Sequence, residues 1–94
     1  MAATHVQKYD SFIRGGLRDQ LGNWRGVDCV PGVGPAAAAR LRERGIDSMY
    51  QILGRFLLME EDEFREFLGE AAGIGPAATD SVADAMGAWV DARS

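Results

Sequence analysis

The sequence predicts a compact all-α protein with five main helices, forming a single domain over residues 1–94. Apolar residues recur at three- and four-residue spacing along most of the chain, which is the helical period. No segment shows the sustained alternation or the β-branched run that a strand needs. The length leaves room for one core, and so small a core covers a modest share of its own surface. A second subunit is therefore expected to add stability.

The first helix is expected over residues 4–13, where Thr4 begins a capping box and Gly15 ends the segment. The glycine-rich stretch 15–28 is expected to form a loop or one short helical turn. Within that stretch, Trp24 is the largest apolar side chain, and we expect it to close the edge of the core.

The second and third helices follow at short spacing. Pro35 stands at the first position of a segment of good helix formers, and Gly45 ends it. Asp47 is expected to cap the third helix. The buried face of the third helix is predicted to consist of Met49, Ile52, Leu53, Phe56 and Leu57.

The fourth helix begins at the acidic cluster 60–63, since negative charge is favourable at a helix N-terminus, and it ends at Gly73. Pro76 begins the last helix. The apolar face of the fourth helix is predicted to be Phe64, Phe67, Leu68 and Ala71, and that of the last helix Ala78, Val82, Ala85, Met86 and Trp89. Ordinary core is the default interpretation of the last face, and a dimer seam along Val82, Met86 and Trp89 is the alternative.

A glycine-rich phrase occurs twice, as VPGVGPAA over residues 30–37 and as AGIGPAA over residues 72–78. Glycine lets the backbone come close to a ligand, and the helix start that follows presents unpaired N–H groups at a positive dipole end. A dinucleotide fingerprint would need a preceding strand, which neither copy has. With helices on both sides the first copy predicts a helix-hairpin-helix motif, in which Val33 anchors the turn and Gly32 and Gly34 offer amides to a nucleic-acid backbone.

The two glycine turns differ in the charge of the residues that follow them. Arg40, Arg42 and Arg44 follow the first, and a basic patch beside a glycine turn favours phosphate binding over a plain joint between helices. Asp80 and Asp84 follow the second, and their charge would repel a phosphate. A structural turn is therefore as good an interpretation of the second copy as an auxiliary contact.

The charge is unevenly distributed. The net charge is −4, yet residues 1–59 carry +3 and residues 60–94 carry −7, so one face is expected to meet an anion and another is not. One cysteine, Cys29, and one histidine, His5, leave no disulfide and no catalytic or metal constellation, and we predict neither an enzyme nor a cofactor. Cys29 is interpreted as a small buried apolar residue. The sequence has no segment long enough for a membrane span, and an intracellular protein is expected.

The stretch VPGVGPAAAARLRERGIDSMYQILGRFL, residues 30–57, and EDEFREFL, residues 61–68, together resemble the barrier-to-autointegration factor family. The opening QKYDSF, the Gly73 turn and the last helix with Trp89 and Asp91 extend the resemblance over nearly the whole chain. The resemblance implies a SAM-like, BAF-like fold and a homodimer that binds double-stranded DNA without sequence preference and bridges two segments. Its place would be the nucleus in a eukaryote and the nucleoid or cytoplasm in a prokaryote.

The resemblance also places candidate sites by position. DNA contacts are implied at Gln7, Lys8, Gly32, Val33, Gly34, Ala36, Ala37 and Arg40, and at Gly75 and Ala77 at the start of the last helix. Gly54 and Leu58 fall in the region where the family binds LEM-domain proteins in a groove across the dimer.

This chain departs from the family pattern in three places. The start of the last helix, basic in the family, holds Ala77 and Asp80; the linker between Ile13 and Gly32 is longer; and the turn before Phe64 is shorter and acidic. We therefore expect DNA affinity to be weaker or more sensitive to salt than in the family. The alternative function is a protein-interaction module of the same fold with weak or lost DNA binding.

Overall fold

Five α-helices and one short 3₁₀ turn make up the part of the chain that the computed structural model describes, residues 5–94. The elements are α1 (His5–Arg14), η1 (Val27–Cys29), α2 (Pro35–Glu43), α3 (Met49–Leu58), α4 (Glu61–Ala72) and α5 (Pro76–Asp91). Over these described residues the only β-type pairings are two isolated bridges, so the predicted all-α class is confirmed. None of the helices in this range has the length and apolar content that crossing a membrane requires.

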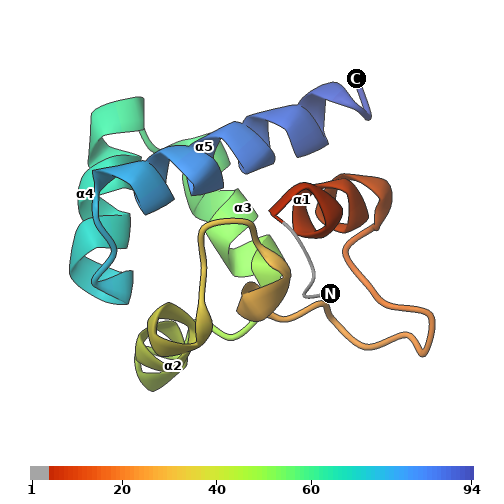
Figure 1. The fold of residues 1–94 in the computed structure, drawn as a ribbon, viewed down its shortest axis with the longest axis horizontal. Helices are drawn as coiled ribbons and strands as arrows, with labels where there is room; N and C mark the ends of the chain where they lie inside the picture. Colours follow the sequence, from red (N-terminus) through yellow and green to blue (C-terminus); the bar gives the residue numbers. More distant parts are fainter. Residues whose placement is uncertain (1–4) are drawn as a thin grey trace.

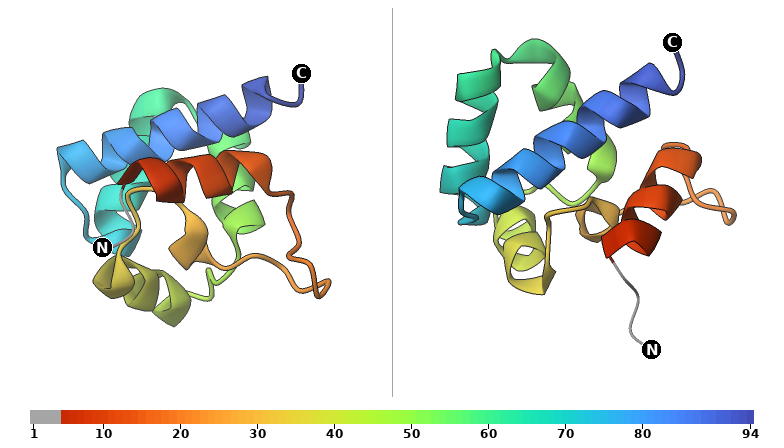
Figure 2. Two further views of the ribbon diagram at one scale, coloured as in Figure 1. Left: turned by 45° about the vertical axis from the view of Figure 1, so that its right-hand side comes forward. Right: turned by 45° about the horizontal axis from the view of Figure 1, so that its top comes forward.

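The longest helix, α5, crosses one side of the molecule, and α1, α3 and α4 pack against it (Figure 1). The short turn η1 contacts α2 and α3 from the opposite side, and α2 also packs against α4. The two further views show the loop that precedes α2 running from η1 toward the start of α5 (Figure 2). This arrangement brings the first glycine turn next to the first turn of the last helix.

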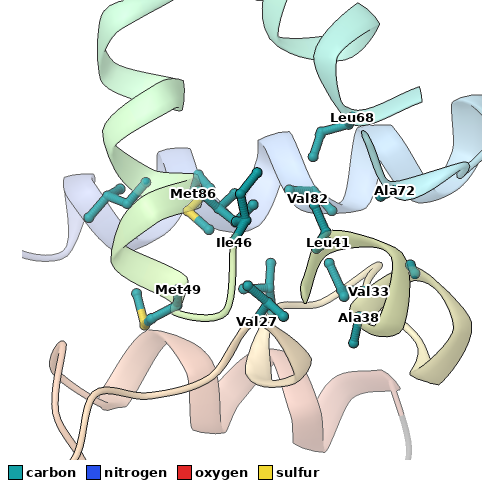
Figure 3. Packing of buried hydrophobic residues seen from close by; sticks show 14 of the residues in the cluster. Val27, Val33, Ala38, Leu41, Ile46, Met49, Leu68, Ala72, Val82 and Met86 are labelled. Carbon is teal, nitrogen blue, oxygen red and sulfur yellow. The ribbon is translucent and has the colours of Figure 1, made fainter. Parts of the chain in front are cut away.

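The core lies where these elements meet (Figure 3). Val27, Leu41, Met49, Leu68 and Met86 come from η1, α2, α3, α4 and α5 in that order, and each of them is fully buried. Met86 therefore belongs to the core, as Val82 does, which confirms the default interpretation of the α5 face. A stripe of buried apolar residues on each element is what holds helices this short in place.

Capping residues fix where α3 and α4 begin. The start of α4 at the acidic cluster is confirmed, and Glu60 and Glu63 form a capping box there. The prediction that Asp47 caps α3 is wrong, because the cap is Ser48. The Gln51 side chain reaches back to the Ser48 amide at 3.0 Å, and this capping box becomes possible only when the helix begins one residue later.

Two apolar side chains lie farther out than predicted. Trp24 is 46 % exposed and packs against Tyr50 with ring centroids 4.7 Å apart and the ring planes tilted by 52°. The Arg18 guanidinium lies 3.8 Å from the Trp24 ring centre. The loop 15–26 projects from the helices (Figure 1). Trp24 therefore packs against Tyr50 on the outer side of α3 and does not close the core edge as predicted. The prediction that Leu57 belongs to the buried face of α3 is wrong, because this side chain, in the last turn of the helix, is 61 % exposed.

Three side chains from distant parts of the chain hold the C-terminal end of α1. Arg25 donates to the carbonyl oxygens of Phe12 and Gly16 at 3.2 and 3.0 Å. The Trp89 indole donates to the Gly15 carbonyl at 3.0 Å, and Arg93 donates to the Ile13 carbonyl at 3.0 Å. Cations and N–H donors satisfy the carbonyls that a helix leaves unpaired at this end.

Candidate nucleic-acid interface

The first glycine turn is closed on itself and anchored in the core. The Val33 amide donates to the Val30 carbonyl at 3.0 Å, and the Val33 side chain is 1 % exposed, as its predicted anchoring role requires. Gly32 has φ +94°, and a Cβ at this position would lie 2.5 Å from the Ala78 carbonyl oxygen. Only glycine allows the hairpin backbone to approach α5 this closely.

The turn leads directly into the uncapped N-terminus of α2. Gly34 is the N-cap residue and has extended backbone angles, Pro35 occupies the first turn, and no side-chain cap bonds to this end of the helix. The amides that a helix start leaves unpaired are thus available to an external acceptor. Ala36 is exposed, whereas the Ala37 methyl group is buried in the core, so Ala37 would contribute through its backbone alone.

The hairpin, the start of α5 and α1 share one hollow of about 390 Å³. It is lined by Lys8, Gly32, Val33, Gly34, Ala77, Ala78 and Ser81. The Lys8 ammonium donates to the Val33 carbonyl at 2.9 Å, which holds a positive charge against the turn. The fold thus brings together predicted residues that lie about 70 positions apart in the sequence. Ser81 was not among the predicted residues, although it stands one helical turn after Ala77.

Arg40 differs from the other basic residues. It is exposed, and among residues 5–94 it is the basic side chain with no hydrogen bond, ion pair or ring contact. The other two arginines of the predicted basic patch have partners within the protein, because Arg42 pairs with Asp28 at 3.4 Å and Arg44 donates to the Glu70 carbonyl. Successive helical residues are turned by about 100°, so Arg42 lies on a different side of α2 from Arg40.

Gln7 lies beside the hollow, on the exposed side of α1. It lines a neighbouring cavity of about 730 Å³ together with Lys8, Arg25 and Cys29. Cys29 is partly buried, and this burial raises the pKa of its thiol above the ordinary value. The thiol is therefore neutral near pH 7, which agrees with its interpretation as a small apolar residue.

The second glycine turn repeats the backbone of the first. Gly75 has φ −83° and ψ −179°, close to the −86° and −177° of Gly34, and each is followed by proline at the helix start. Gly75 is exposed, and Ala77 reaches the hollow beside the hairpin. Asp80 is hydrogen-bonded to Arg65, so a cation offsets the charge that was expected to repel a phosphate there.

Gly54 and Leu58 lie together on the outer face of α3, apart from the hairpin. With Ile46, Tyr50, Gln51, Arg55 and Met59 they line a mainly apolar hollow of about 450 Å³. Leu58 is 89 % exposed, and nothing lies within 4 Å of the place where a Cβ of Gly54 would be. A leucine this exposed beside an open glycine marks an apolar surface that no residue in the described range 5–94 covers.

Comparison of the sequence with known proteins identifies the family of the chain. The family model for barrier to autointegration factor matches residues 3–93. The chain belongs to the barrier-to-autointegration factor family. It is 33 % identical to barrier-to-autointegration factor B of Xenopus laevis over 88 residues, covering 92 % of each chain. It is 32 % identical to barrier-to-autointegration factor of Mus musculus over 91 residues, covering 95 % of this chain and 97 % of the mouse protein.

A nematode relative shows the same similarity over a shorter span. Barrier-to-autointegration factor 1 of Caenorhabditis elegans is 33 % identical over 67 residues, which cover 69 % of this chain and 75 % of that protein. The resemblance drawn from the sequence is thereby confirmed for the family and the fold.

Proposed function

We propose that this member of the barrier-to-autointegration factor family binds the phosphate backbone of double-stranded DNA without sequence preference. The observation that carries the proposal is the position of Arg40 on the helix that follows an uncapped glycine turn. Arg40 is an exposed cation with no hydrogen bond or ion pair to the residues that the structure describes. Lys8 adds a second positive charge at the same turn. Backbone amides and cations of this kind position phosphates and carry no information on the bases.

The charge on Arg40 is expected to decide DNA affinity. Arg40→Glu removes one charge-assisted contact, which is worth about 1.5–3 kcal/mol, and affinity for any duplex should therefore fall by about tenfold or more. The measurement is an electrophoretic shift series on several unrelated duplexes at two salt concentrations. Loss of one phosphate contact should also make the slope of log K against log salt less negative by about 0.9.

Arg42→Glu is the matched control, because it makes the same change in net charge on the same helix while Arg42 pairs with Asp28. Its effect on affinity should be small. Equal retardation of DNA by wild type and by the Arg40→Glu protein would contradict the proposed function.

We further propose that two copies associate through the outer face of α3 and so bridge two duplexes. Tyr50, Leu57 and Leu58 are 39, 61 and 89 % exposed on one face of α3, and Gly54 opens a place between them for close approach. Apolar surface of this kind is costly to leave in water, and a small domain gains stability by covering it.

Leu58→Glu is expected to halve the mass in solution, because it places a charge in the contact between the two copies. Light scattering after size exclusion measures that mass. Leu21→Glu is the control, since Leu21 is 86 % exposed and lies in the loop 15–26. The monomeric variant should still shift single duplexes but no longer bridge them. A dimer that persists in the Leu58→Glu protein would place the contact elsewhere.

The second candidate function, a protein-interaction module, is favoured by the same apolar hollow around Gly54 and by the −7 charge of residues 60–94. Absence of any DNA shift at low salt, together with specific recovery of a protein partner that Leu58→Glu abolishes, would support it over DNA binding.

A further inference from the structure

We propose that Gly73 is a positioning residue for Arg40. In this role the second glycine turn holds the Arg40 guanidinium in place for phosphate binding beside the first glycine turn. The inference rests on the proposed DNA binding, because it assigns Gly73 a part in the same site. The inference also gives a role to the second glycine-rich motif, residues 72–78. The sequence alone does not decide whether this motif is a structural turn between two helices or an auxiliary contact with DNA.

The geometry at Gly73 carries the proposal. Gly73 ends α4 in the left-handed conformation, with φ +67°. A Cβ at this position would lie 3.0 Å from Nη1 of Arg40, 3.2 Å from its Cδ and 3.3 Å from its Cζ. The Arg40 side chain thus lies along the bare backbone of the turn from its stem to its guanidinium, and it occupies the space that a side chain would take.

No other described group competes for this role. Arg40 has no carboxylate partner and no ring contact among residues 5–94, so packing against the Gly73 backbone is the contact that orients it. The C-terminal end of α4 has no basic residue of its own in its last turn. A guanidinium placed there is also favoured by the partial negative charge at the end of a helix. Arg40, which belongs to α2, fills that position.

A matched pair of glycines makes the inference testable. Gly45 follows α2 with φ +79°, close to the φ of Gly73, but nothing lies within 4 Å of its Cβ position. Asparagine is the side chain that best tolerates this conformation after glycine, so Gly73→Asn and Gly45→Asn strain the backbone alike. They differ in what the new side chain meets, which is Arg40 in one case and open space in the other.

Gly73→Asn is expected to weaken binding of a 20-base-pair duplex by about fivefold, since it displaces one charge-assisted contact without removing the charge. Gly45→Asn should bind within about twofold of wild type, as expected for a surface substitution. In an Arg40→Gln background, Gly73→Asn should cause no further loss, because the side chain that it displaces no longer carries a charge. Equal effects of the two asparagine variants would overturn the proposal. So would a full loss from Gly73→Asn in the Arg40→Gln background, which would indicate that the turn itself contacts DNA.

A second readout does not depend on DNA and separates failure of this inference from failure of the proposed function. The Nε–H signal of Arg40, followed by nitrogen-15 relaxation, should show a restricted side chain in wild type and in Gly45→Asn. It should show a mobile one in Gly73→Asn. Equal Arg40 mobility in all three proteins would overturn the positioning role even if wild type binds DNA. Absence of a wild-type DNA shift with a restricted Arg40 would contradict DNA binding alone.

Discussion

Gly32→Ala is expected to lower the free energy of unfolding by about 3 kcal/mol or more, because the substitution combines left-handed backbone strain with an overlap in a packed site. The new methyl group would lie 2.5 Å from the Ala78 carbonyl oxygen and 2.9 Å from a methyl group of Val82. The first of these is a backbone atom in the first turn of α5 and cannot move aside as a flexible side chain could. The hairpin would have to separate from α5, and the hollow that both of them line would open.

Gly34→Ala is the control two residues away. Gly34 has φ −86°, which any residue adopts, and nothing lies within 4 Å of its Cβ position. Its cost should be about 1 kcal/mol or less, as for the loss of a favourable N-cap glycine. Urea unfolding followed by circular dichroism measures both variants. Equal midpoints for the two would show that the contact between Gly32 and α5 is not what holds the hairpin.

Phe64→Ala is expected to cost about 3–5 kcal/mol, the range for deleting a buried aromatic ring. Phe64 is 1 % exposed and packs edge-on against Phe56, with ring centroids 5.4 Å apart. A natural domain is stable by about 5–15 kcal/mol, so the variant should lose a large share of its stability and melt at a clearly lower temperature. Removal of the ring takes packing from α3 and α4 together, because each helix contributes one member of the pair.

Leu21→Ala, at an exposed position in the loop 15–26, should change the free energy of unfolding by less than about 0.5 kcal/mol. Calorimetry on both variants gives the comparison. A Phe64→Ala protein that melts near the wild-type temperature would mean that the α3–α4 contact adds little to stability.

Local patterns explain why the helices could be predicted so closely. Pro35, Gly73 and Pro76 mark ends that depend on backbone chemistry within a few residues, and these ends lie where predicted. The cap of α3 was misplaced by one residue because Asp47 and Ser48 are both good caps. The decision between them depends on Gln51, whose side chain fits only one start.

The side-chain partners at the candidate site could not be predicted, for a different physical reason. The sequence shows where an arginine lies along a helix but not which distant group binds it. Arg42 pairs with Asp28, and Arg44 donates to the Glu70 carbonyl. Both partners belong to elements that only the fold brings near α2. Trp24 was misplaced for the same reason, since its stacking partner Tyr50 lies on another element. Lys8 and the hairpin could be predicted, whereas the contact between Arg40 and Gly73 could not.

The hydrogen bonds at the C-terminal end of α1 affect the order in which the protein folds during its synthesis. This end of the helix is bound by Trp89 and Arg93, which lie 74 and 80 residues further along the chain than the carbonyls they bind. A ribosome therefore delivers the earliest helix, together with Arg25 that also binds its end, long before Trp89 and Arg93. Contacts of such sequence separation form slowly. A chain that stops short of Trp89 should leave that helix undocked and open to proteases until translation is complete.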